Sequence, residues 1–236
     1  MEKFGGDIGN KYANIDQRGR RAVDLGEIEL FRGASEQLKE RFNFSLFFSS
    51  SSTESLKRVV LDEIESLSGR LGINLFLTGR DFPAHVTILE GTPTFMENKA
   101  ENEVALDQIF DDLKNNAELK KKLSNMLVGK TVEFKYILID RGNLILTCVD
   151  IPEFIIEARK LISDAYSTSH IKPLEIKNIL HITLSRIVSI PENPEILNRY
   201  KEEIIKLRHI VSKNPLSLTF GSVESGRSYD LLTKSN

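Results

Sequence analysis

Two apolar segments, far apart in the chain, each contain a histidine followed two positions later by a threonine. They are His85-Val86-Thr87-Ile88 and His181-Ile182-Thr183-Leu184. Both read as β-strands, and alternate residues of a strand project to the same face. We therefore expect each strand to present an imidazole beside a hydroxyl on one face and to bury its apolar residues on the other. If the two strands face one another, these four polar side chains form a symmetric cradle.

The repetition of this motif exceeds what residue frequency alone would give. The chain has four histidines and eleven threonines among its 236 residues. At that frequency, two of four histidines would be followed by threonine at this spacing in about 1% of such sequences. A single histidine on an apolar strand is more often a buried structural residue, so the inference of function rests on the pair.

The remaining pattern predicts helices interspersed with hairpin strands, which favours an α+β fold over a continuous parallel sheet. We expect residues 1–41 to form an N-terminal extension, either solvated or wrapped around the domain. Residues 42–236 form the main domain, with a helical insertion at about 92–130. The predicted strands are 42–48, 73–77, 84–89, 131–140, 144–149, 179–185, 216–220 and 228–232, and the predicted helices are 54–71, 102–113, 117–127, 152–166 and 195–211.

Composition narrows the possible functions. The formal net charge is -2, so an RNA or nucleotide must bind through a local basic region rather than a basic surface. No apolar run approaches the roughly 18 to 20 residues of a membrane span, and the N-terminus lacks the apolar core of a secretory signal. We therefore expect a cytoplasmic protein that does not bind membranes. The single cysteine, Cys148, reads as a small buried hydrophobe.

Paired imidazoles suit acid-base chemistry on a phosphoester. A neutral imidazole can take a proton from the attacking hydroxyl or water, and a protonated one can donate to the leaving oxygen. The two threonine hydroxyls could donate hydrogen bonds to the nonbridging oxygens. His85 and His181 are thus the candidate catalytic residues, and Thr87 and Thr183 the candidate phosphate-binding residues. Two histidines without a third ligand at a recognisable spacing do not make a zinc site. We therefore expect neither a metal nor a cofactor.

The paired motifs resemble those of the 2H phosphoesterase superfamily, which includes 2′-5′ RNA ligase-like proteins and 2′,3′-cyclic nucleotide phosphodiesterases. The second copy is the closer match, because an arginine in the place of Arg186 is common in the ligase-like branch. The resemblance implies two pseudo-symmetric lobes, with antiparallel sheets lining a central cleft and helices outside. It also implies metal-independent cleavage of 2′,3′-cyclic phosphates or 2′-5′ linkages by two histidines.

Other residues are weaker candidates. Simple alternation puts Ser185 on the face of His181, where it could contact a phosphate, and points Arg186 to the other face unless a bulge turns it. His170 in a connecting segment and His209 near a helix end read as structural. Tyr136 and Tyr229 could stack on a base, although strand aromatics more often pack.

Three functions remain open at this stage. The first is a phosphodiesterase acting on RNA ends or 2′-5′ linked oligonucleotides. The second keeps the same chemistry for a small nucleotide such as an ADP-ribose cyclic phosphate. The third is an RNA- or nucleotide-binding module without turnover. The near-symmetry of the motifs does not say which histidine is acid and which is base, and we favour a monomer.

Overall fold

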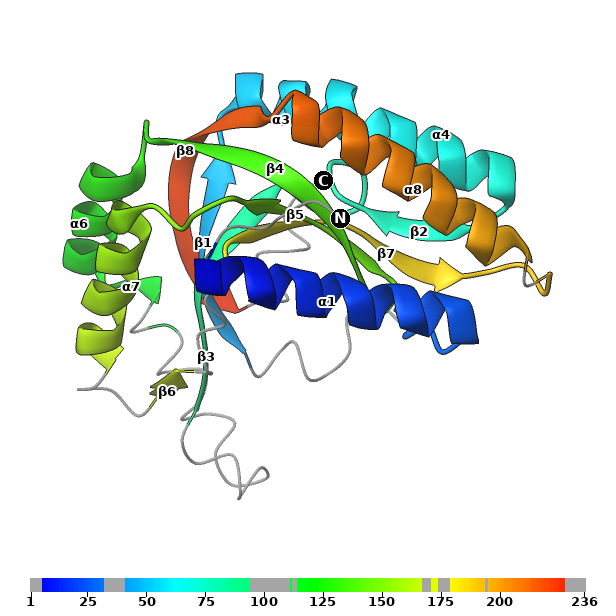
Figure 1. Ribbon diagram of the computed structural model, residues 1–236. Coiled ribbons are helices and arrows are strands. Elements are labelled where there is room, and N and C mark those ends of the chain that lie inside the picture. The colour runs from blue at the N-terminus through cyan, green and yellow to red at the C-terminus, as the bar shows by residue number, and fades with distance from the viewer. Residues whose placement is uncertain are drawn as a thin grey trace.

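The computed structural model describes residues 6–31, 41–93, 111, 114–166, 171–173, 179–193 and 195–227. They form an α+β fold (Figure 1), which confirms the predicted class. The helices are α1 (Gly6–Leu25), α3 (Ser50–Leu56), a π-helical segment (Lys57–Leu61), α4 (Asp62–Leu71), α6 (Ala117–Leu127), α7 (Glu153–Tyr166) and α8 (Glu195–Lys213). The strands are β1 (Phe42–Phe48), β2 (Asn74–Leu77), β3 (His85–Pro93), β4 (Thr131–Asp140), β5 (Asn143–Cys148), β6 (Ile171–Pro173), β7 (His181–Ser189) and β8 (Leu216–Arg227).

The eight strands of the described residues belong to one antiparallel sheet, in the order β2-β7-β5-β4-β8-β1-β3-β6. This order divides into two four-stranded halves, β4-β5-β7-β2 and β8-β1-β3-β6, in which the motif strands β7 and β3 hold equivalent places. The halves are joined by the pairing of β4 with β8. They meet a second time where β7 pairs with β3. The two histidine motifs therefore lie at the second junction.

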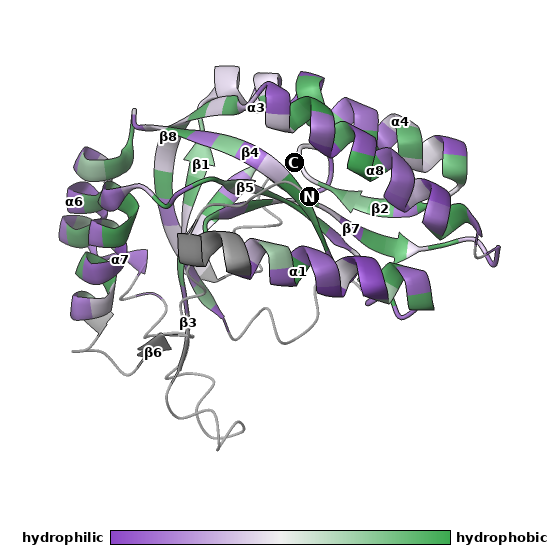
Figure 2. Cartoon of the chain, viewed as in Figure 1, coloured by the Kyte–Doolittle hydropathy of each residue, from purple (hydrophilic) through white to green (hydrophobic). Residues whose placement is uncertain are grey.

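Helices and sheet share one large apolar core. α4 and α8 pack together, and α8 lies along β4, whereas α6 and α7 pack together beside β8 and β3 (Figure 1). Figure 2 shows green and purple alternating along α8, as expected of a helix with one side on the sheet. No helix of the described residues is long and apolar enough to cross a membrane.

Most element boundaries agree with the sequence prediction. The helix expected at 54–71 starts earlier, at Ser50, because the Ser49 side chain accepts a hydrogen bond from the Ser52 amide and caps it. It ends at Gly72, which has a φ of 67° as in a left-handed cap. The predicted strand 228–232 lies outside the described residues, as does almost all of the predicted helix 102–113.

The β4–β5 hairpin turns at Arg141 and Gly142, which have φ values of 49° and 107°. Positive φ at both central residues is typical of the tight turns that suit the twist of a hairpin. A Cβ at position 142 would lie 2.5 Å from Cγ2 of Ile28 and 2.8 Å from the Glu29 carbonyl oxygen. Glycine is required at this position both by the turn and by the segment that crosses it.

The described part of the N-terminal extension is packed rather than solvated. α1 lies along β4 and contacts α8 (Figure 1), and its residues Tyr12, Asp16 and Val23 are buried. The Asp16 carboxylate accepts a hydrogen bond from the Ile139 amide at 3.3 Å, and Arg208 donates to the Ile137 carbonyl at 2.6 Å. Both backbone groups lie beyond the part of β4 that pairs with β8, so α1 and α8 cover a strand edge that would otherwise be exposed.

Candidate active site

The two motif strands share a single backbone pairing, Val86 with Ile182, and they run antiparallel. This register sets His85 across from Thr183 and Thr87 across from His181. Val86 and Ile182 are fully buried, so the four polar residues lie on the opposite face. The structure thus brings together the four residues singled out in the sequence.

Strand pairing extends this arrangement into two rows across the sheet. The row that contains His85 is mostly apolar, and the row that contains His181 is mostly hydroxyl-bearing. The first row is Phe47, His85, Thr183, Ile145 and Leu138, and the second is Ser45, Thr87, His181, Thr147 and Tyr136. The backbone is nearly symmetric about the bridge, but the two histidines have different surroundings.

Each motif strand has a β-bulge directly after its threonine. On β3 the register against β1 shifts at Ile88, and on β7 the register against β5 shifts at Leu184. A bulge reverses which residues of a strand face each side. Ser185 consequently points into the core, where it is fully buried beside the Tyr200 hydroxyl, and Arg186 turns onto the histidine face.

The observed positions of Ser185 and Arg186 correct the prediction for the first residue and decide between the two alternatives for the second. Ser185 does not share the face of His181, because simple alternation fails at the bulge. Arg186 follows the alternative in which a bulge turns it toward the motif residues. Its guanidinium carbon lies 5.4 Å from the centre of the Phe31 ring.

His85 has a defined hydrogen bond and an aromatic surround. Its Nδ1 lies 2.9 Å from the Pro83 carbonyl oxygen, which can only accept, so Nδ1 carries a proton and Nε2 of the neutral ring is an acceptor. The rings of Phe47 and Phe82 lie 5.7 Å and 6.3 Å away. Burial lowers the pKa of His85, the Pro83 bond partly opposes this, and the Arg186 charge lowers it further.

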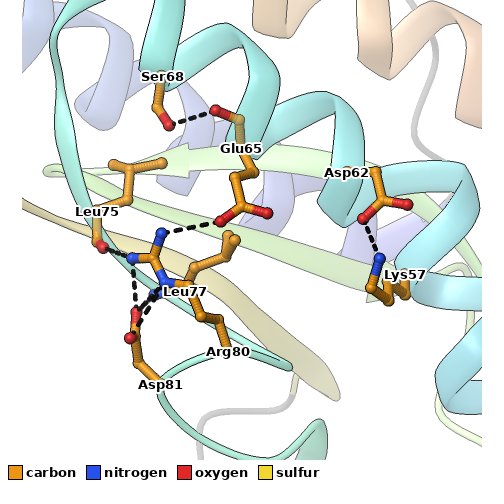
Figure 3. Close-up of polar contacts among 8 residues, drawn as sticks. All are labelled: Lys57, Asp62, Glu65, Ser68, Leu75, Leu77, Arg80 and Asp81. Carbon is orange, nitrogen blue, oxygen red and sulfur yellow. Dashed lines mark hydrogen bonds and ion pairs between the residues drawn. The ribbon is translucent and has the colours of Figure 1, made fainter.

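The turn before His85 is fixed by polar contacts (Figure 3). The Arg80 guanidinium donates to Glu65 of α4 at 3.0 Å, to Asp81 at 2.8 Å and to the Leu75 carbonyl. The Asp81 carboxylate in turn accepts from the Leu77 amide at 2.6 Å. These bonds hold the segment that carries the Pro83 carbonyl. A surface pocket lies alongside it, lined among others by Thr53, Arg80, Phe82 and Phe47.

Aromatic side chains connect Arg186 to His85. Phe31 lies 4.8 Å from Phe76, Phe76 stacks on Phe82 at 5.0 Å, and Phe82 meets the His85 ring edge-on. Sequence reasoning did not identify these residues as part of the site. Phe76 follows the alternation of β2, but Phe31 belongs to the N-terminal extension, and no local pattern indicates where it lies.

The other residues considered from the sequence lie away from the two motifs or outside the described residues. Tyr136 ends the row that contains His181 and packs against the cluster around Tyr12. His209 is exposed on α8, and its carbonyl accepts from Ser212. His170 and Tyr229 lie outside the described residues. Within the described part of the chain, no three His, Cys, Asp or Glu side chains gather closely enough to hold a metal ion.

Comparison with known proteins gives only distant structural likeness. No family model matches the sequence, and no curated protein matches it. Among solved structures, Kluyveromyces marxianus Usb1 with uridine monophosphate aligns with 14% identity and a TM-score of 0.36, over 81% of this chain and 99% of that one. A second structure of the same protein aligns with 14% identity and a TM-score of 0.34, over 80% and 98%.

Proposed function

We propose that this chain is a phosphodiesterase that opens 2′,3′-cyclic phosphates or cleaves 2′-5′ linkages with two histidines as acid and base. The observation that carries the proposal is the single Val86–Ile182 pairing and the register it sets. An imidazole and a hydroxyl from each strand then lie diagonally about one point. A tetrahedral phosphate at that point would have hydroxyl donors and proton-transfer groups on both sides.

His85 is the proposed base. Its Nδ1–H donates a hydrogen bond to the Pro83 carbonyl, so Nε2 carries the lone pair and can accept a proton. A lowered pKa keeps this ring neutral at working pH, as a base must be before the reaction. His181, in the row of hydroxyl residues, is then the proposed acid.

The proposed reaction is hydrolysis of a phosphodiester. His85 takes a proton from water, and the water oxygen forms a bond to phosphorus. The bond between phosphorus and one ribose oxygen breaks, and His181 gives its proton to that oxygen. The products are a phosphomonoester and a free hydroxyl, which lie on one ribose after opening of a cyclic phosphate and on separate nucleosides after cleavage of a 2′-5′ linkage. Proton exchange with solvent restores both imidazoles. Thr87 and Thr183 would hold the nonbridging oxygens as charge develops on them.

The test is hydrolysis of a panel of phosphodiesters, with product analysis. The panel contains 2′,3′-cyclic nucleotides, 2′-5′ and 3′-5′ dinucleotides and an ADP-ribose cyclic phosphate, each assayed with EDTA present. We expect turnover of at least one 2′-linked or cyclic substrate, and a loss of about 100-fold or more in kcat for His85→Ala and for His181→Ala. His209→Ala serves as the control histidine and is expected to match the wild type.

Two results would contradict the proposal. One is full activity in both motif variants, which would move the chemistry elsewhere. The other is binding of these compounds without cleavage at any pH, which would favour a binding module. Retention of kcat with a raised KM in Thr87→Val and Thr183→Val would assign those hydroxyls to binding rather than to stabilisation of the transition state.

A further inference from the structure

The junction between the motif strands has very little backbone pairing. Beyond the Val86–Ile182 bridge, β3 continues along β1 and β6, and β7 continues along β5 and β2. One bridge is a weak constraint on two strands that diverge in this way. The relative position of the two histidine motifs therefore depends on what else connects β3 to β7.

Arg159 of α7 makes that connection. Its Nε donates to the Ile88 carbonyl at 2.9 Å, and its Nη2 donates to the Ile179 carbonyl at 2.9 Å. Ile88 is the bulged residue directly after Thr87, and Ile179 lies two residues before His181. A single planar guanidinium thus bonds β3 and the segment that leads into β7, close to the candidate catalytic residues of both motifs, and its rigid fork fixes the separation of the two carbonyls.

The side chain is held firmly and buried. Arg159 is 7% exposed, and the neighbouring α7 residues Ile155, Ala158 and Ile162 are fully buried in the core. No carboxylate of the described residues forms an ion pair with its guanidinium. Burying a cation in this way is costly, and the two carbonyls are the groups that the structure provides to offset that cost.

We propose that Arg159 is a positioning residue that sets the spacing between the His85–Thr87 and His181–Thr183 motifs. The role in catalysis rests on the function proposed above. Loss of the guanidinium would let β3 and β7 drift, and a displacement of about 1 Å between reacting groups can cost about 100-fold in rate. Binding contacts made by each strand alone would persist.

Arg208 offers a matched control. It is 8% exposed, and its Nε also donates to a strand carbonyl, that of Ile137 at 2.6 Å. The two arginines have similar burial, and Arg208 is in addition paired with the buried Asp16 carboxylate, so its loss should cost at least as much stability. Arg208, however, connects α8 to β4 and to Asp16 of α1 rather than to either motif strand. Comparing the two separates a general loss of stability from a specific loss of positioning.

The experiment compares Arg159→Met, Arg159→Lys and Arg208→Met, using 2′,3′-cyclic CMP and each protein well below its unfolding midpoint. For Arg159→Met we expect kcat to fall about 30-fold or more, with KM within about threefold of wild type. Arg159→Lys keeps the charge and one hydrogen bond, so its kcat should lie between those of Arg159→Met and the wild type. Arg208→Met should retain kcat within about threefold. Wild-type kcat in Arg159→Met, or an equal loss in Arg208→Met, would overturn the proposal.

A second measurement does not depend on turnover. Nitrogen-edited NMR spectra of the imidazoles should change for both His85 and His181 in Arg159→Met and stay unchanged in Arg208→Met. Unchanged imidazole signals in Arg159→Met would overturn the positioning role even if the wild type cleaved no substrate. Changed signals in an inactive wild type would instead leave the positioning role intact and reject the proposed function. If Arg159→Met does not fold, Arg159→Lys against Arg208→Lys makes the same comparison.

Discussion

Glu90 and Arg186 occupy equivalent positions on the two motif strands, and each reaches the histidine face because a bulge precedes it. The two residues have equivalent places in the backbone, but their side chains carry opposite charges. Glu90 forms an ion pair with Arg41 at 2.8 Å, whereas Arg186 lies over the Phe31 ring. Burial lowers the pKa of the Arg186 guanidinium, and the Glu90 charge is the first of the neighbouring charges that oppose this, so the two side chains lie near enough to interact. Arg186 is therefore the cation on the histidine face that an anionic substrate would meet.

The bulge on β7 predicts opposite results for two adjacent substitutions. Ser185→Ala removes a hydroxyl that points into the core, so kcat/KM should stay within about threefold of wild type. Arg186→Ala removes a cation from the histidine face, and kcat/KM should fall about 10-fold or more because an anionic substrate loses a charged partner. Steady-state kinetics on the best substrate of the panel measure both. A larger loss in Ser185→Ala than in Arg186→Ala would contradict the register.

The charge of Arg186 also predicts a change in the titration of His85. A nearby cation disfavours the imidazolium, and it is one cause of the lowered pKa of His85. Arg186→Ala should therefore raise the pKa of His85, and the acid limb of the rate profile should move to higher pH. Arg186→Lys keeps the charge and should leave the limb nearly in place. NMR titration of the imidazole measures this directly, and a fall in pKa on loss of Arg186 would refute it.

Much of the fold was predictable because its signals are local. Alternating apolar residues indicated β4, β5 and β7, and Gly72 and the 141–143 turn were recognisable from residue type alone. The His-x-Thr motifs indicated which side chains share a face, since that depends only on strand alternation. Whether the two motif strands pair with each other could not be predicted, because the register between distant strands is set by the packing of the whole sheet.

The parts that could not be predicted depend on distant contacts. The bulges at Ile88 and Leu184 arise from a mismatch with partner strands, and each leaves two consecutive buried residues. Residue type does not reveal them, because Ile88-Leu89 resembles an ordinary apolar run and the polar Ser185 reads as a residue of the opposite face. The hydrogen bonds of Arg159 join α7 to β3 and to Ile179 before β7, which lie far apart in sequence. The polar composition of α1 left open whether the segment is solvated or wrapped around the domain. Asp16 is buried against Arg208, a contact that no local pattern predicts.

Close packing of α1 on β4 predicts that Gly19 tolerates no side chain. A Cβ at this position would lie 1.9 Å from the Ile139 carbonyl oxygen, which is backbone and cannot move freely. Gly19→Ala should lower the free energy of unfolding by about 1 to 3 kcal/mol. Gly69→Ala is the control, because nothing lies within 4 Å of its Cβ, and it should raise stability by about 0.5 to 1 kcal/mol. Urea unfolding measures both, and equal effects would contradict the packing.

The Asp16–Arg208 pair predicts a large loss when one partner is removed. Asp16 is 1% exposed and accepts hydrogen bonds from both terminal nitrogens of the Arg208 guanidinium. Asp16→Ala leaves a buried cation without its anion and should cost about 3 to 5 kcal/mol. Glu63→Gln breaks the exposed pair with Arg70 and should cost less than about 1 kcal/mol. Chemical denaturation distinguishes these outcomes, and a loss in Asp16→Ala as small as in Glu63→Gln would show that the pair is not buried in solution.

The buried thiol of Cys148 provides a reporter for the docking of α1. Burial raises its pKa to about 11, and the Tyr12 hydroxyl of α1 lies 3.9 Å from Sγ. Native protein at pH 8 should therefore react with a disulfide reagent about 100-fold more slowly than unfolded protein, because few molecules carry a thiolate. The chain has one cysteine, so the signal is unambiguous. Tyr12→Ala should speed labelling while the far-UV spectrum of the remaining fold persists, whereas rapid labelling of the wild type would mean that α1 does not cover this site.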